Sequence, residues 1–271
     1  MTNITEKEFR LLVDYVKQSY GINLTEKKTL VVGRLQNILI QKNMKNFTEY
    51  FDYISSDASG DSVVELINKL TTNHTYFLRE AEHFNFFNTK VLPELVKRQY
   101  RTKDMRIWSA GCSTGEEPYT LAMLMSEYFG LEKGYWDTKL LATDISSKVI
   151  NAATSGIYLN EQLASLPEQW QRNYFKKIDQ EKSAIVDKIK NEVIFRIFNL
   201  MNDVFPFKKK FHVIFCRNVM IYFDAKTKRE LVSKFYDNTE DGGYLFIGHS
   251  ESIGRDETKY KYIMPAVYRK E

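Results

Sequence analysis

Apolar residues recur at helical spacing through the first 70 residues of the chain. Thr5 is followed three residues later by Glu8, which is the pattern of a capping box, and apolar positions then recur until Gly21. Three further helices are expected at about residues 27–41, 47–54 and 62–70. The pattern therefore predicts a small all-helical N-terminal domain.

The pattern changes from Met105 onward, where short apolar runs alternate with amphipathic segments. Runs typical of buried strands lie at residues 105–108, 139–143, 193–198, 212–215 and 244–247. Alternation of this kind indicates a mainly parallel sheet that is covered by helices on both faces. We therefore expect an α/β fold in this part of the chain.

The boundary between the two predicted domains is placed after Arg79. The helical domain then covers residues 1–79 and the α/β domain covers residues 80–271, and an amphipathic stretch at residues 80–99 joins them. The interval between Asp144 and Val193 is too long for a simple crossover. It predicts a small inserted subdomain at about residues 157–192, with a helix at residues 162–175 and a polar stretch at residues 176–190.

Composition and charge exclude several classes of protein. No run of about 18 apolar residues occurs, which argues against a transmembrane helix, and the polar N-terminus lacks the apolar core of a secretion signal. Cys112 and Cys216 are too few for a disulfide framework, so we expect a cytoplasmic protein that does not insert into a membrane. A net charge of +4 is too small to favour nucleic-acid binding.

The turn after the first predicted strand carries the first chemical signal. Gly111 lies in a run of small residues, and Glu116 and Glu117 follow at the start of the next helix. Two carboxylates at that point would repel a dinucleotide pyrophosphate, whereas S-adenosylmethionine has no phosphate and carries a cationic sulfonium and ammonium. This argues against a nicotinamide dehydrogenase on the same sheet, although at least one of the glutamates is expected only to complement the helix dipole.

Polar residues follow the later strands as well. Asp144 can accept hydrogen bonds from ribose hydroxyls or can simply cap the next helix, and the Arg217–Asn218 pair can bind a ligand or serve as a cap. His249 and Glu251 lack further ligands at suitable spacing, so no metal site is expected. The segment from residue 70 to residue 79 indicates, on its own, only a loop between helices.

Five segments together resemble the signature blocks of the CheR family, the chemotaxis-receptor glutamate methyltransferases. They cover residues 70–79, 107–119, 142–144, 214–223 and 248–251, in the family's order. The resemblance implies a helical N-terminal domain and a Rossmann-like methyltransferase domain with a small inserted β-subdomain. It also implies transfer of a methyl group from S-adenosylmethionine to glutamate side chains of bacterial chemoreceptors, which leaves S-adenosylhomocysteine.

The same resemblance assigns site residues. Those placed at the cofactor are Asn73, Thr75, Arg79, Glu117, Asp144, Asn199, Leu200, Arg217 and Asn218, together with Gly111 of the glycine-rich turn. Arg79 and Tyr222 are the expected catalytic residues, which align the reacting groups. A glutamate carboxylate is already ionised at neutral pH, so no general base is required. A module that binds S-adenosylmethionine or a receptor without turnover, and a methyltransferase that acts on RNA or a small molecule, remain as alternatives.

Two features bear on the receptor. Lys27 and Arg34 share a face of the second predicted helix and are expected to contact the glutamate-rich methylation region, unless that face is merely solvated. Residues 174–190 contain no glycine and look shorter than the matching loop of family members that bind a receptor's C-terminal tether peptide. We therefore expect this protein not to depend on such a peptide.

Overall fold

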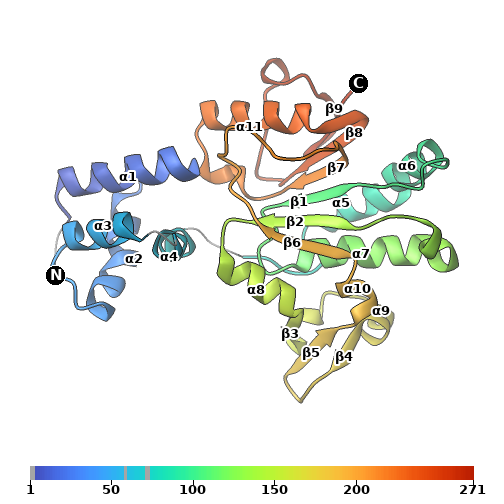
Figure 1. Ribbon diagram of the computed structural model, residues 1–271, viewed down its shortest axis with the longest axis horizontal. Coiled ribbons are helices and arrows are strands. Elements are labelled where there is room, and N and C mark those ends of the chain that lie inside the picture. The colour runs from blue at the N-terminus through green and yellow to red at the C-terminus, as the bar shows by residue number, and fades with distance from the viewer. Residues whose placement is uncertain (1–3, 58–59, 71–73) are drawn as a thin grey trace.

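A computed structural model describes residues 4–57, 60–70 and 74–271 (Figure 1). The helical start of the chain is confirmed, with helices α1 (Glu6–Tyr20), α2 (Lys28–Gln41), α3 (Phe47–Ser56) and α4 (Asp61–Leu70). The predicted capping box before α1 is present, since the Thr5 and Glu8 side chains each accept a hydrogen bond from the other's backbone N–H. Gly21 ends the helix in the left-handed conformation, with φ of 73°.

A bent helical segment leads from this domain to the sheet. It consists of α5 (Ala81–Phe86), a π-helical turn (Phe87–Val91) and α6 (Leu92–Arg98). Pro93 has no backbone N–H to donate and would crowd the carbonyl four residues earlier in a regular α-helix. The π-helical turn directly before it is the kind of local widening that accommodates such a residue.

The central sheet confirms the predicted α/β class. Its strand order is β6-β2-β1-β7-β8-β10-β9, and the first five of these strands are parallel. The strands are β1 (Ile107–Ala110), β2 (Leu140–Asp144), β6 (Val193–Ile197), β7 (Phe211–Cys216), β8 (Thr239–Ile247), β9 (Lys261–Met264) and β10 (Val267–Arg269). The predicted strand at residues 105–108 is displaced, since β1 begins at Ile107, and the antiparallel strands β9 and β10 were not predicted.

Helices cover both faces of this sheet. Leu231 and Phe235 of α11 (Ala225–Asp237) pack in the same cluster as Trp108 and the N-terminal helices, while α7 (Glu116–Phe129) packs on the opposite side with Phe215. Alternate residues of β1 and β7 enter the two clusters, as the period of a strand requires. Shorter helices in this domain include α8 (Ser147–Ser155) and the 3-10 turns Gly130–Tyr135, Met220–Tyr222 and Arg255–Glu257.

A second, three-stranded antiparallel sheet lies within the interval of the predicted insertion (Figure 1). Its order is β3 (Ile157–Leu159), β5 (Lys182–Ile185) and β4 (Phe175–Lys177). The helix expected at residues 162–175 is wrong as one element, because a 3-10 turn (Asn160–Leu163) and α9 (Glu168–Tyr174) replace it. The polar stretch that follows holds β4, β5 and α10 (Asp187–Lys190), so its polarity reflects exposed, short strands.

The helical domain is bonded directly to the sheet domain. The Asn23 N–H donates to the Tyr222 carbonyl at 2.8 Å, and Lys17 pairs with Asp224 at 2.8 Å. Asn68 of α4 donates to Ser146 at 3.0 Å on the other side of the contact. Among the described residues, no helix is both long and apolar enough to cross a membrane.

Candidate active site

A cavity of about 410 Å³ opens where the carboxyl ends of the parallel strands meet the helical domain. Tyr20, Ile22, Ile67 and Asn68 of the helical domain close one side of it. The predicted cofactor residues that line it are Thr75, Arg79, Gly111, Glu117, Asp144, Asn199, Leu200, Arg217 and Asn218. Tyr222 lines it as well, whereas Asn73 lies outside the described residues. The predicted residues therefore come together, although their individual roles stay predictions.

The glycine-rich turn is shaped by close backbone packing. Gly111 has φ of 87°, and a Cβ on it would overlap the Val219 side chain. The N–H groups of Gly111 and Cys112 both donate to the Thr143 carbonyl, at 2.7 and 2.9 Å. This turn consequently brings the end of β1 against the end of β2 and leaves its backbone at the cavity wall.

The two glutamates at the start of α7 play different parts. Glu116 is buried and accepts hydrogen bonds from the Thr114 hydroxyl, and burial raises the pKa of its carboxyl. Glu117 lines the cavity, where it accepts from Ser109 at 2.7 Å and from Arg217 at 2.9 Å. Only Glu117 is thus placed to meet a cationic ligand.

Asp144 does not cap the next helix, because Ser146 is the N-cap of α8, and the Asp144 side chain instead holds the backbone of two turns. One carboxylate oxygen accepts from the Ser113 N–H at 2.9 Å and the other accepts from the Ser146 N–H at 3.0 Å. Asp144 also lines the cavity. Burial raises its pKa, and the backbone hydrogen bonds only partly oppose that shift. Asp144 therefore shapes two turns at the cavity wall, and its role toward the ribose stays a prediction.

Arg217 lies at the centre of a buried ionic network. Its guanidinium is bonded to Glu117 at 2.9 Å, to Glu80 at 3.1 Å and to the Arg79 carbonyl, and it lies 5.1 Å from the centre of the Phe84 ring. Two carboxylates offset the cost of burying this charge. Arg217 therefore ties the cavity wall to the segment that carries Arg79.

Asn199, Leu200 and Tyr222 complete the cavity beside the helical domain. The Asn199 amide donates to the Ser19 carbonyl at 2.8 Å, and its oxygen accepts from the Met201 N–H at 2.9 Å. Asn199 thus links the two domains, in addition to lining the cavity. Leu200 is largely buried beside it and Tyr222 is half-buried.

The predicted receptor residues lie outside this lining. Lys27 precedes α2 instead of beginning it, and its Nζ lies 5.9 Å from the centre of the Tyr222 ring. Arg34 is half-buried and donates to the Lys69 carbonyl at 2.8 Å. Arg34 therefore also takes part in the contact between α2 and α4, and the expected receptor contact of both residues stays a prediction.

Residue-by-residue reasoning missed several groups at the site. Glu251 is buried and accepts from the N–H groups of Gly248, Asn218 and Ile221 at 2.6, 3.0 and 3.1 Å. Burial raises its pKa against these bonds. Glu80 was also missed, although its position beside Arg79 was a signal. No pattern in the sequence indicated that the helical domain lines part of the cavity, because this depends on how the two domains pack.

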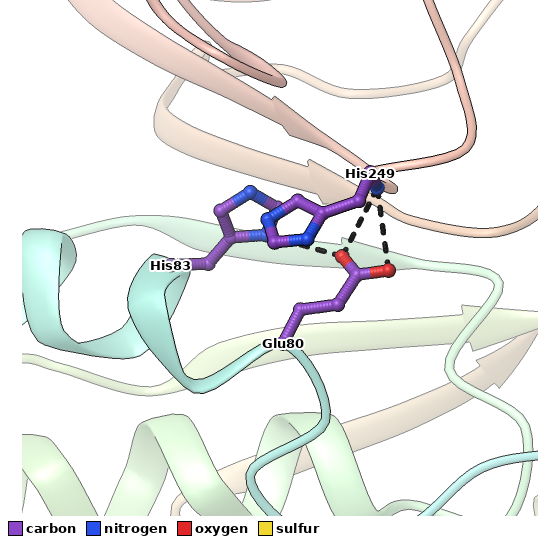
Figure 2. Close-up of side chains that lie close together, drawn as sticks. All are labelled: Glu80, His83 and His249. Atoms are coloured by element: carbon purple, nitrogen blue, oxygen red, sulfur yellow. Dashed lines mark hydrogen bonds and ion pairs between the residues drawn. The ribbon is translucent and has the colours of Figure 1, made fainter.

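Glu80, His83 and His249 are of the types that bind transition metals, and their potential ligand atoms lie within 4.8 Å of one another (Figure 2). Both oxygens of Glu80 already accept hydrogen bonds, from Arg217, Asn218 and the His249 N–H. A metal ion would have to displace these donors and approach the Arg217 cation. The cluster therefore fits a hydrogen-bonded junction better than a metal centre.

Comparison with known proteins agrees with this geometry. The family model described as "CheR methyltransferase, SAM binding domain" matches residues 73–268, and that described as "CheR methyltransferase, all-alpha domain" matches residues 7–71. The chemotaxis protein methyltransferase of Borreliella burgdorferi is 45% identical, over 99% of this chain and 95% of that protein. The chemotaxis protein methyltransferase of Escherichia coli is 35% identical, over 98% and 91%. The chain therefore belongs to the CheR methyltransferase family and contains its S-adenosylmethionine-binding domain.

Proposed function

We propose that this protein transfers a methyl group from S-adenosylmethionine to glutamate carboxylates in the methylation region of bacterial chemoreceptors, in the cytoplasm. One observation carries the choice of a carboxylate substrate. Arg79 lines the cavity, and its guanidinium forms no ion pair with any residue that the structure describes; among those residues, its side chain donates to the His74 carbonyl. Arg217, by contrast, is neutralised by two glutamates. Arg79 is thus a cation still free to hold a carboxylate.

The chemistry needs alignment and no proton transfer. S-adenosylmethionine supplies an electrophilic methyl group on a cationic sulfur. A glutamate carboxylate is ionised at neutral pH and forms an ester bond to that methyl as the sulfur–carbon bond breaks. Arg79 orients the carboxylate, Tyr222 donates a weaker positioning hydrogen bond, and Glu117 and Asp144 hold the cationic and ribose parts of the cofactor.

The names of the relatives support the receptor as substrate, since the similar proteins of Borreliella burgdorferi and Escherichia coli are both called chemotaxis protein methyltransferases. Lys27 beside Tyr222 adds a positive charge near the cavity. A glutamate-rich receptor segment would be attracted to that side of the molecule. No nucleic acid, metal ion or inserted membrane segment enters this proposal.

The test is incubation with methyl-labelled S-adenosylmethionine and membranes that contain chemoreceptors. We expect label on the receptor that mild base releases as methanol, because esters hydrolyse under conditions that methylated amines survive. Base-stable label would contradict the proposal. Binding of S-adenosylmethionine without transfer to any receptor would instead favour a non-catalytic binding module.

A further inference from the structure

The backbone on both sides of Arg79 is strained. Leu78 has φ of 60° and Glu80 has φ of 55°, so two residues with side chains adopt the left-handed conformation around one arginine. This conformation is unfavourable for a residue with a side chain and persists only where its surroundings hold it. The surroundings that hold this turn therefore also set where the Arg79 guanidinium points.

On the N-terminal side, Phe77 anchors the turn. Its side chain is fully buried, with the rings of Tyr158 and Phe175 at 4.9 and 5.6 Å. The Ser165 hydroxyl donates to the Phe77 carbonyl at 3.0 Å. The inserted β-sheet thus fixes the residue that precedes the strained turn.

On the C-terminal side, the anchor is the Glu80 carboxylate (Figure 2). It accepts from the His249 N–H at 3.2 Å to each oxygen, from the Asn218 amide at 3.2 Å and from Arg217 at 3.1 Å. Arg217 in turn donates to the Arg79 carbonyl. Glu80 therefore fastens the turn to the loops that follow β7 and β8.

The charges around Glu80 suit a permanent anchor. His83 is fully buried with Nδ1 3.4 Å from a Glu80 oxygen, and burial lowers its pKa to about 4, so it is neutral near pH 7. The charge of Arg217 and the hydrogen bonds outweigh burial and lower the pKa of Glu80. Glu80 does not line the cavity, although Arg79, Arg217 and Asn218 do.

We propose that Glu80 is a positioning residue for methyl transfer, which holds the strained turn so that Arg79 faces the cavity. This inference rests on the proposed function. Glu80 acts through Arg79 and does not contact the reacting atoms. His249 and Asn218 contribute by holding Glu80, one through its backbone N–H and one through its side-chain amide.

A double-mutant cycle tests the inference. Glu80→Gln should lower kcat by at least about tenfold, a larger factor than its effect on the Kd for S-adenosylhomocysteine, because misplacement of an aligning group costs rate. In the Arg79→Ala background the same change should lower kcat by less than about twofold, since residues that act as a unit are not additive. An equal loss in both backgrounds would overturn the inference.

Two further variants make the result specific. Glu82→Gln changes an exposed carboxylate two residues after Glu80, one that lies 3.8 Å from Nε2 of His249 and not at the His249 backbone N–H, and should leave kcat unchanged. Glu80→Asp keeps the charge on a shorter side chain and replaces Glu80→Gln as the test if that variant folds poorly. The decrease in kcat that Glu80→Asp causes should also disappear in the Arg79→Ala background. A loss that persists there would count against the inference.

Hydrogen exchange separates this inference from the proposed function, because it needs no substrate. Backbone N–H groups at residues 76–84 should exchange faster in Glu80→Gln than in wild type or Glu82→Gln. Unchanged exchange would show that Glu80 does not hold the turn. A wild-type protein that lacks transferase activity yet shows the expected exchange would contradict the function and leave the anchor standing.

Discussion

At the scale of single residues, the main feature of this site is a set of buried and half-buried carboxylates. Glu117 and Asp144 face the cavity, while Glu80 and Glu251 hold the loops around it. Each accepts several hydrogen bonds, and that is how a protein retains a carboxylate away from bulk water. The acidic residues are thus divided between binding and shaping.

Asp144→Ala should weaken the binding of S-adenosylhomocysteine by roughly 1–3 kcal/mol, since it leaves ribose hydroxyls without an acceptor. Ribose donors favour the ionised carboxylate, so the complex binds fewer protons than the free protein. Because burial raises the pKa of Asp144 in the free protein, affinity should fall as the pH is lowered through that pKa and should be flat above it. Calorimetry at several pH values checks this, and an Asp144→Asn protein that keeps the same pH dependence would speak against it.

Arg79→Ala should lower kcat by about 100-fold or more, in the range found when one preorganised hydrogen-bond donor is removed. Stability should change little, because the side chain makes a single hydrogen bond within the part of the chain that the structure describes, to the His74 carbonyl. Tyr222→Phe is the matched comparison and should cost less, since no proton needs to leave the carboxylate. A folded Arg79→Ala protein with the wild-type rate would remove Arg79 from the mechanism.

At the scale of elements, the sequence predicts the position of a strand best where one face or both faces of the strand are apolar. The parallel strands β2, β6 and β7 are apolar runs and were found close to their predicted places. β3, β4 and β9 are three or four residues long and mostly exposed, and β10 is buried but only three residues long, so none of them carries a continuous apolar signal.

The candidate site was only partly accessible to the same reasoning. Residues at the ends of parallel strands, such as Glu117 and Asp144, follow from topology. Arg79 lies before the sheet domain, and only the family resemblance placed it at the cofactor. Glu80 and the lining from the helical domain depend on backbone conformation and domain packing, neither of which shows in spacing.

The start of α2 belongs to the proposed receptor surface. Lys27→Glu should raise the apparent KM for receptor and leave the affinity for S-adenosylhomocysteine unchanged, because charge steers the encounter. Lys97→Glu on α6, at the far side of the molecule, is the control (Figure 1). Arg34→Glu is a less specific test of receptor binding, since it also removes the hydrogen bond to the Lys69 carbonyl between α2 and α4. Equal KM values for Lys27→Glu and wild type would place the contact elsewhere.

The inserted sheet is the part of the molecule where a receptor's C-terminal tether peptide would be expected to bind. The hairpin between β4 and β5 is closed by Asp179, which accepts from the N–H groups of Glu181 and Lys182 at 2.8 and 2.7 Å, and it contains no glycine. A peptide backbone would meet side chains at its approach. We predict no detectable heat when a receptor C-terminal pentapeptide is titrated into the protein. Specific binding at micromolar concentration would refute this.

For the molecule as a whole, two buried histidines contribute a loss of stability in acid. Burial lowers the pKa values of His83 and His212 from 6.5 to about 4. The unfolded chain therefore takes up more protons between these values, and stability is lost as the pH falls from about 6.5 toward 4, by roughly 3 kcal/mol per histidine. Urea unfolding across this range should show a shallower loss in His212→Asn, whose amide oxygen can still accept from the Arg106 N–H. If the stability of His212→Asn and of wild type fell equally with pH, His212 would not be a source of the loss.

The helical domain packs against the sheet domain, and residues of both domains line the cavity. Ile22 and Phe223 form a bridge across the contact, and both line the cavity. The proposed reaction therefore depends on the whole chain. Its most direct test is tandem mass spectrometry of a chemoreceptor after reaction with the protein and S-adenosylmethionine. The account predicts methyl groups on glutamate side chains of the methylation region, lost in Arg79→Ala; methyl groups on lysine or arginine, or none at all, would contradict it.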